Sequence, residues 1–196
     1  MFTGIVEEIG RVSKLKRNGT SIALTVRART VLRGLRKGDS ISVNGVCLTV
    51  TEKGAGRFAV QAVEETLRKT NLGTLREGSA VNLERSILPN SRMGGHFVLG
   101  HVDTTGRIES IKNLKSSRLM WISVSKRFAK LLIPVGSVAI DGVSLTVARL
   151  ETTRFAVSLI PYTLKVTTLG RSRIGDRVNI EFDVLGKYVQ RMIGRK

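Results

Sequence analysis

The stretch Ser40-Ile-Ser-Val-Asn-Gly-Val-Cys-Leu-Thr-Val50 recurs 97 residues later as Ser137-Val-Ala-Ile-Asp-Gly-Val-Ser-Leu-Thr-Val147. This spacing holds without a gap as far as Glu84 and Glu181, and 20 of the 45 aligned positions are identical. Upstream, residues 4–12 resemble residues 100–108 at a spacing shorter by one residue. Such self-similarity indicates a duplicated unit. We expect two copies of fewer than 100 residues, bounded at 1–90 and 91–182, and a final segment at 183–196.

Each copy has the pattern of an all-β unit. Apolar residues alternate with polar ones on both sides of Asn44-Gly45, a dipeptide typical of tight hairpin turns. Residues 58–63 and 80–84 read as further short strands, and residues 29–35 and 126–132 could each hold one helix. About six short strands with Gly-rich turns favour a closed barrel over a sandwich, because closure removes the exposed edges. The predicted fold is two homologous six-stranded Greek-key-like β-barrels in tandem, followed by a C-terminal α-helix.

The C-terminal segment has a helical apolar stripe. Its members are Phe182, Val184, Leu185, Tyr188, Val189, Met192 and Ile193. Since no third unit is present to cover this stripe, we expect the helix of a partner subunit to pack against it.

Composition limits the class of protein. The chain has 196 residues and a formal charge of +18, but its basic residues are scattered and aromatic residues make up only 5%. This pattern favours a solvated basic surface over a nucleic-acid groove. The apolar stretch 131–140 is too interrupted to span a membrane. The only cysteine, Cys47, excludes an internal disulfide framework and fits a reducing compartment, so a cytoplasmic location is expected.

The strand period places Cys47 and Thr49 on one face of the first hairpin, and Ser144 and Thr146 on the same face of the second. This face is either an ordinary barrel exterior or part of a pocket, and Cys47 is either buried filler or a pocket residue. His96 and His101 would point to opposite faces of a strand, which disfavours a shared metal. For either histidine the pattern allows a structural hydrogen bond or a catalytic role.

Five motifs in order resemble the riboflavin synthase family, α-chain type. They are Met1-Phe-Thr-Gly-Ile-Val-Glu-Glu8, Asn44-Gly-Val-Cys-Leu-Thr-Val50, Gly94-Gly-His-Phe-Val-Leu-Gly-His-Val-Asp103, Asp141-Gly-Val-Ser-Leu-Thr-Val147 and Asn179-Ile-Glu-Phe-Asp183. The resemblance implies two barrels, a helix that assembles a homotrimer, and a dismutation that uses no cofactor and no metal. In that reaction two molecules of 6,7-dimethyl-8-ribityllumazine exchange a four-carbon unit, which yields riboflavin and 5-amino-6-ribitylamino-2,4-pyrimidinedione.

The resemblance also implies a composite site. It would be formed by the first barrel (the N-barrel, residues 1–90) of one subunit and the second barrel (the C-barrel, residues 91–182) of its neighbour. The N-barrel would contribute Cys47, Leu48 and Thr49, with a strand containing Gln61, Ala62, Val63, Glu64, Glu65 and Thr66. The C-barrel would contribute Gly4, Ile5, Val6, Gly100, His101, Val102, Ser144, Leu145, Thr146, Leu159, Ile160, Pro161, Tyr162 and Thr163. Phe2 and Thr3 would help to close the site, and Asp183 would either organise polar groups or cap the terminal helix.

By the same resemblance, His101 is the candidate for proton transfer. Cys47 and Ser144 are candidates to activate or to mimic an attacking water, and Thr146 is grouped with them. Val135 departs from the family pattern, which often has a lysine there, so a charged contact to the substrate is in doubt.

Two other functions compete with the enzyme. One is a non-catalytic lumazine- or flavin-binding antenna protein, in which one barrel is expected to degenerate; here both barrels keep the hairpin motif and His101 is present. The other is a basic nucleic-acid-binding barrel, favoured by net charge alone. The charge of +18 has no task in a reaction of phosphate-free substrates, so docking to an acidic partner such as lumazine synthase is a further hypothesis.

Overall fold

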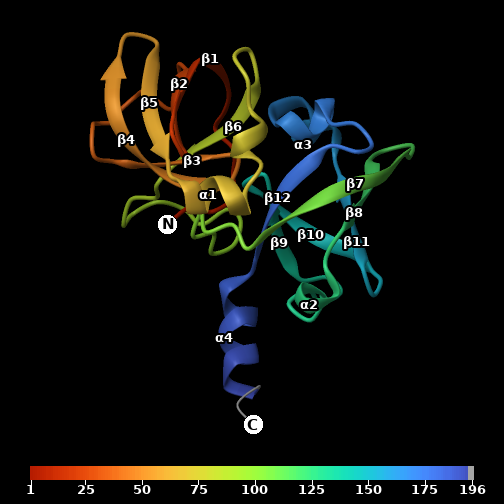
Figure 1. The fold of residues 1–196 in the computed structure, drawn as a ribbon. Helices are drawn as coiled ribbons and strands as arrows, with labels where there is room; N and C mark the ends of the chain where they lie inside the picture. Colours follow the sequence, from red (N-terminus) through yellow and green to blue (C-terminus); the bar gives the residue numbers. More distant parts are fainter. Residues whose placement is uncertain (194–196) are drawn as a thin grey trace.

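The computed structural model describes residues 1–193 and contains two closed antiparallel β-barrels and a projecting helix (Figure 1). The first barrel comprises β1 (Glu8–Asn18), β2 (Ser21–Arg27), β3 (Ser40–Val43), β4 (Val46–Gly54), β5 (Arg57–Ala62) and β6 (Ala80–Arg85). The second comprises β7 (Thr104–Asn113), β8 (Arg118–Ser123), β9 (Ser137–Ile140), β10 (Val143–Leu150), β11 (Arg154–Leu159) and β12 (Arg177–Phe182). This confirms the predicted fold class.

The two barrels have the same topology. The first closes in the order β1-β2-β5-β4-β3-β6, and the second follows the same circular order with β7 to β12 in place of β1 to β6. Register shifts occur at equivalent places, next to Val12 and Val50 in one barrel and next to Ile108 and Val147 in the other. Because bulges increase local twist and bend a strand, they help six short strands to close.

Alternation along β4 places Val46, Leu48 and Val50 in the buried core of the first barrel, as predicted. The turns have the backbone of type I′ hairpins, since Asn44 and Gly45 have φ of 48° and 78°, and Asp141 and Gly142 have 45° and 78°.

The short helices differ from the prediction in part. They are α1 (Glu64–Lys69), η1 (Leu72–Thr74), α2 (Lys126–Ala129), α3 (Pro161–Val166), η2 (Thr168–Arg171) and α4 (Val184–Ile193). The helix expected within 126–132 is present but limited to α2. The expected strand at 61–66 is wrong, because β5 ends at Ala62 and α1 begins at Glu64.

The helix predicted at residues 29–35 is also wrong. The carboxylate of Glu8 accepts hydrogen bonds from the amides of Arg29, Thr30 and Val31. A tight turn follows, and Gly34 has a φ of 79°, which a right-handed helix does not allow. The segment is therefore a turn held against the start of β1.

Helix α4 extends away from both barrels (Figure 1). The oxygen Oδ1 of Asp183 accepts the amide of Leu185 at 2.9 Å, so the capping role is confirmed for this residue. The exposed apolar side chains of α4 are Leu185, Tyr188, Val189, Met192 and Ile193. Phe182, expected in this helical stripe, is instead fully buried at the end of β12, and Val184 is half-buried. The predicted segment 183–196 is helical as far as Ile193, and residues 194–196 lie outside the described part of the chain.

Candidate active site on two equivalent hairpin faces

In each barrel, one strand is paired on only one side over the hairpin motif that the sequence singled out. Strand β4 pairs with β3 over Val46–Thr49, whereas its pairing with β5 includes Val50 and the residues that follow. In the second barrel, β10 pairs with β9 over Val143–Thr146 and with β11 from Val147 onward. The outer faces of these half-paired segments present Cys47 and Thr49 in one barrel and Ser144 and Thr146 in the other. Both cysteine and serine are half-buried, and both threonines are exposed.

A segment of the other copy lies against one end of each face, at Cys47 and at Ser144, and leaves Thr49 and Thr146 exposed. The amide of Cys47 donates to the carbonyl of Gly100 at 2.9 Å, and the amide of Ser144 donates to the carbonyl of Gly4 at 2.8 Å. Both glycines have a φ of 79°. A Cβ at Gly100 would lie 2.5 Å from Cβ of Cys47, and one at Gly4 would lie 2.6 Å from Cβ of Ser144. Glycine is required at both positions by conformation and by space.

The segments around Gly4 and Gly100 thus each cross to the barrel of the other copy, and this crossing changes one predicted grouping. Gly4–Val6 lies at the C-barrel as expected, and Val6 packs against the core of that barrel. Gly100–Val102, however, lies at the N-barrel rather than the C-barrel, because Gly100 bonds to Cys47 and Val102 packs on the N-barrel core. The stretch 94–103 is not a strand, apart from the isolated bridge at Val98, so the expectation that alternation would separate the two histidines does not apply.

The two crossing segments, which contain residues 2–6 and 98–102, meet between the barrels. Phe2 and Val98 exchange main-chain hydrogen bonds of 2.7 and 3.1 Å. Phe2 is fully buried and packs with Val98 and Ala139, and Cys47 packs against this cluster. Phe2 therefore anchors the seam between the two segments and supports the cysteine.

Two buried glutamates hold the crossing segments. The carboxylate of Glu84 accepts the amides of Thr3 at 2.7 Å and Gly4 at 3.0 Å, and also the Thr3 hydroxyl. The carboxylate of Glu181 accepts the amides of Leu99 at 2.7 Å and Gly100 at 2.9 Å. Burial raises the pKa of both carboxyls, an effect that the amide donors partly oppose.

His96, for which the sequence left a structural and a catalytic role open, lies beside Ser144. Its Nδ1 is 2.7 Å from Oγ of Ser144, and its Nε2 is buried without a hydrogen-bond partner in residues 1–193. Burial lowers the pKa of this imidazole, with Asp183 acting in the opposite direction. A neutral imidazole bonded to a hydroxyl is the arrangement that general-base chemistry requires. His101, the predicted proton-transfer residue, is exposed.

The remaining predicted residues differ in burial. Leu48, Ala62 and Leu159 are buried and belong to the barrel cores. Thr66, Thr163 and Leu145 are half-buried. The exposed members are Ile5, Gln61, Val63, Glu64, Glu65, Ile160, Pro161 and Tyr162. Among these exposed residues, Ile5, Val63, Ile160 and Tyr162 are large and apolar.

Val135 is 81% exposed and has a φ of 63°. The first copy has Gly38 at the equivalent position, with a φ of 91°. A β-branched residue in this region of backbone space is strained.

Two cavities of the single chain lie away from the hairpin faces. One, of about 540 Å³, lies between the first crossing segment and the residues that follow β6, and the other, of about 480 Å³, lies over β1, β2, β4 and β5. Neither is lined by Cys47, Thr49, Ser144 or Thr146.

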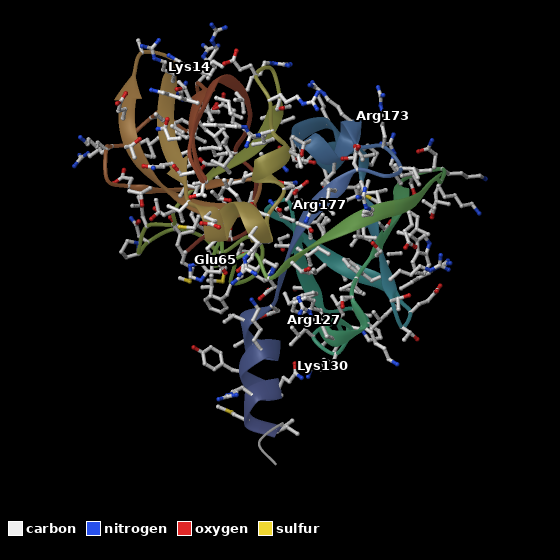
Figure 2. The ribbon with its side chains drawn as sticks, in the orientation of Figure 1. Lys14, Glu65, Arg127, Lys130, Arg173 and Arg177 are labelled. Carbon is white, nitrogen blue, oxygen red and sulfur yellow. The ribbon has the colours of Figure 1, made fainter. Side chains whose placement is uncertain are left out.

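The basic residues are distributed over both barrels. Figure 2 shows Lys14 on β1, Arg127 and Lys130 at α2, and Arg173 and Arg177 near and on β12. Within residues 1–193, no His/Cys/Asp/Glu group is arranged to hold a metal ion, and no helix is long and apolar enough to cross a membrane.

Fold and site together define a duplicated β-barrel protein with two related, non-identical candidate ligand faces. A family model described as the lumazine binding domain matches residues 3–86 and again residues 99–183. The chain is 43% identical to riboflavin synthase of Actinobacillus pleuropneumoniae, over 100% of this chain and 91% of that protein. It is 42% identical to riboflavin synthase of Bacillus subtilis (strain 168), over 98% and 90%. The chain belongs to the riboflavin synthase family.

Solved structures agree on the fold. LumP complexed with riboflavin superposes with a TM-score of 0.87 at 22% identity, over 93% of this chain and 99% of that one. LumP complexed with 6,7-dimethyl-8-(1'-D-ribityl) lumazine gives 0.84 at 23% identity, over 92% and 98%. Identity at this level establishes the shared two-barrel architecture.

Proposed function

We propose that this chain is a riboflavin synthase. Two molecules of 6,7-dimethyl-8-ribityllumazine react to give riboflavin and 5-amino-6-ribitylamino-2,4-pyrimidinedione. The observation that carries the proposal is the pair of equivalent but different faces, with Cys47 in one barrel and Ser144 in the other. A dismutation needs two copies of one molecule in different roles, and two related sites suit that need. Full-length relatives at 42% and 43% identity support the enzyme.

The two faces that react belong to different subunits. The exposed apolar residues Val63, Ile160 and Tyr162, together with the stripe on α4, support a homotrimer in which the N-barrel of one chain faces the C-barrel of the next. Such an assembly would enclose faces that lie open on one chain. Holding both heterocycles in register makes a bimolecular step effectively unimolecular, which supplies much of the rate.

The chemistry requires loss of a proton from the 7-methyl group of one lumazine and addition of a nucleophile to the ring of the other. His96 and Ser144 form a pair in which the neutral imidazole can take the hydroxyl proton, or that of a water in its place. His101 and Cys47 serve the N-barrel face, since Gly100 joins that segment to β4. Thr49 and Thr146 supply exposed hydroxyls to ring or ribityl oxygens.

The remaining assignments are the domain boundaries and the setting. We assign residues 1–90 and 91–182 to the two lumazine-binding domains and 183–196 to the oligomerisation segment. The free thiol of Cys47 suits the reducing cytoplasm. The basic surface suits docking to an acidic lumazine synthase, an association that high salt should weaken.

The test is turnover of 6,7-dimethyl-8-ribityllumazine by the purified chain, with no cofactor added. We expect one riboflavin for every two lumazines consumed, followed by riboflavin fluorescence and by chromatography of both products. Tight binding without product would overturn the enzyme in favour of the antenna protein. No binding at all would remove both functions.

A further inference from the structure

Glu84 and Glu181 hold main chain rather than side-chain cations. Both glutamates are almost fully buried, at 4% and 3% exposure, and each accepts two successive amides, one on each carboxylate oxygen. The sequence separation across these bonds is about 80 residues. The bonds are charge-assisted and short, so each carboxylate fixes both the position and the direction of the segment it holds.

Each carboxylate binds the amide of a glycine whose carbonyl contacts a candidate face. Gly4, whose amide bonds to Glu84, uses its carbonyl to accept the amide of Ser144 in the C-barrel. Gly100, whose amide bonds to Glu181, uses its carbonyl to accept the amide of Cys47 in the N-barrel. Glu84 lies on β6 of the N-barrel and Glu181 on β12 of the C-barrel. The path from each glutamate therefore leads to the face of the opposite barrel.

A carboxylate is the side chain that this geometry requires. Both of its oxygens meet a donor, so the isosteric amide of glutamine would place an NH₂ group against a backbone N–H. Glutamine keeps the volume of the side chain and therefore the packing of the barrel. It removes one acceptor and leaves one buried amide without a partner.

We propose that Glu84 and Glu181 are positioning residues that act across the barrel interface. Glu84 orders residues 3–6 over the Ser144 face of the C-barrel, and Glu181 orders residues 99–102 over the Cys47 face of the N-barrel. The crossing itself is a property of the chain; its relevance to turnover rests on the proposed function of these faces. Each glutamate therefore orders the half-site of the barrel to which it does not belong, and the two half-sites are ordered separately.

The single cysteine gives a direct readout of one face. Cys47 is the only thiol in the chain, and the segment at Gly100 packs directly on it. In the full-length protein without substrate, we expect Glu181→Gln to raise the rate at which Cys47 reacts with a disulfide reagent at least tenfold. Glu84→Gln should raise that rate at least threefold less than Glu181→Gln does, since the segment that Glu84 holds reaches Cys47 only through Phe2. Equal acceleration by both variants would mean that they merely loosen the fold and would overturn the proposal, as would no acceleration by Glu181→Gln.

The order of the opposite face is measured with a thiol placed at residue 144. In a Cys47→Ser, Ser144→Cys background the pattern should reverse, so that Glu84→Gln accelerates the reaction of the new thiol more than Glu181→Gln does. Global unfolding exposes both thiols and cannot produce this reversal. Glu109→Gln, at an exposed glutamate on β7 of the C-barrel, serves as the matched control and should change neither rate.

Turnover separates this inference from the proposed function. If the parent protein makes no riboflavin but the thiol rates follow the crossed pattern, the positioning role holds and the proposed function fails. If riboflavin is made but the crossed pattern is absent, the proposed function holds and the positioning role fails. If both hold, each glutamine variant should lower kcat at least tenfold, since ordering of a face matters most in the reacting complex.

Discussion

Gly45 and Gly142, the turn glycines of the two equivalent hairpins, pack against each other backbone to backbone. A Cβ at Gly45 would lie 2.6 Å from the amide nitrogen of Gly142, and a Cβ at Gly142 would lie 2.7 Å from that of Gly45. The carbonyls behind these turns, at Asn44 and Asp141, accept the side-chain amides of Asn179 and Asn82. The hairpins that carry the candidate faces therefore also form the centre of the barrel–barrel interface.

Gly45→Ala should destabilise the protein by about 2–4 kcal/mol, because strain at positive φ adds to overlap with a backbone that cannot move aside. Gly56→Ala is the matched control, since Gly56 has a φ of 69° but no heavy atom within 4 Å of the added Cβ. It should cost about 1 kcal/mol. Denaturant unfolding measures both, and equal losses would show that the hairpin contact contributes nothing.

Asp141 makes stability depend on pH. Burial raises the pKa of this carboxyl from 3.8 to about 7, against hydrogen bonds from Asn179 and Asn71 that lower it. The folded protein therefore holds the proton more tightly than the unfolded chain. Its stabilising contribution is complete below the unfolded pKa and is lost as the pH rises through the window from 3.8 to about 7.

Asp141→Asn should remove most of this loss. The first copy has Asn44 at the equivalent place, and its Oδ1 accepts the amide of Asn82, just as Oδ1 of Asp141 accepts the amide of Asn179. We expect the variant to gain about 1–4 kcal/mol over the parent at pH 8 and little at pH 4. The melting temperature across this range checks it. A gain that is the same at both ends would exclude titration of Asp141 as the cause.

Val135→Gly should stabilise the protein by about 1 kcal/mol, since the φ of 63° suits glycine and the exposed side chain loses little packing. The reverse change, Gly38→Val at the equivalent position, should destabilise the first barrel by a similar amount. Thermal unfolding of both variants tests the pair. A loss of stability in Val135→Gly would instead point to packing of this side chain.

Val189→Asp should dissociate the proposed trimer, because it places a charge in the exposed apolar stripe of α4. Gln190→Asp introduces the same group on the next residue, away from the stripe, and should leave the assembly intact. Sedimentation velocity gives the mass of each species. A fully active monomer would contradict a site shared between subunits.

His96→Ala should lower kcat about 10²-fold or more while KM changes little, if the imidazole acts on a proton at Ser144 in the transition state. His101→Ala should likewise lower turnover more than binding. Steady-state kinetics with 6,7-dimethyl-8-ribityllumazine distinguish these roles. A raised KM with unchanged kcat would restrict either histidine to substrate binding.

The hairpin faces were predictable because alternation is local. The period of two in Val46, Leu48 and Val50 shows which side of the strand is buried, and therefore which side holds Cys47. The same reasoning failed for residues 61–66 and for residues 29–35. In the first case a helix begins at Glu64, and in the second the Glu8 carboxylate holds the backbone in a turn. Neither the start of this helix nor the contact with Glu8 changes the apolar pattern of the segment concerned.

His96 and the two glutamates had weaker signals. Glu84 and Glu181 are identical at equivalent positions of the repeat, at the end of the matching Val-Asn-x-Glu strands, and that coincidence could have identified them. His96 has no counterpart of this kind, and its bond to Ser144 joins residues 48 positions apart.

The sequence by itself determined the duplication, the hairpins with their turn glycines, the buried faces of the strands and the apolar stripe of the last helix. Each of these follows from local periodicity or turn chemistry. Only the tertiary structure decided that Gly100 covers the N-barrel and Gly4 the C-barrel. The physical reason is that these segments are held through main-chain amides and carbonyls. Every residue supplies the carbonyl and every residue except proline supplies the amide N–H, so the side-chain pattern of a segment does not record where it binds.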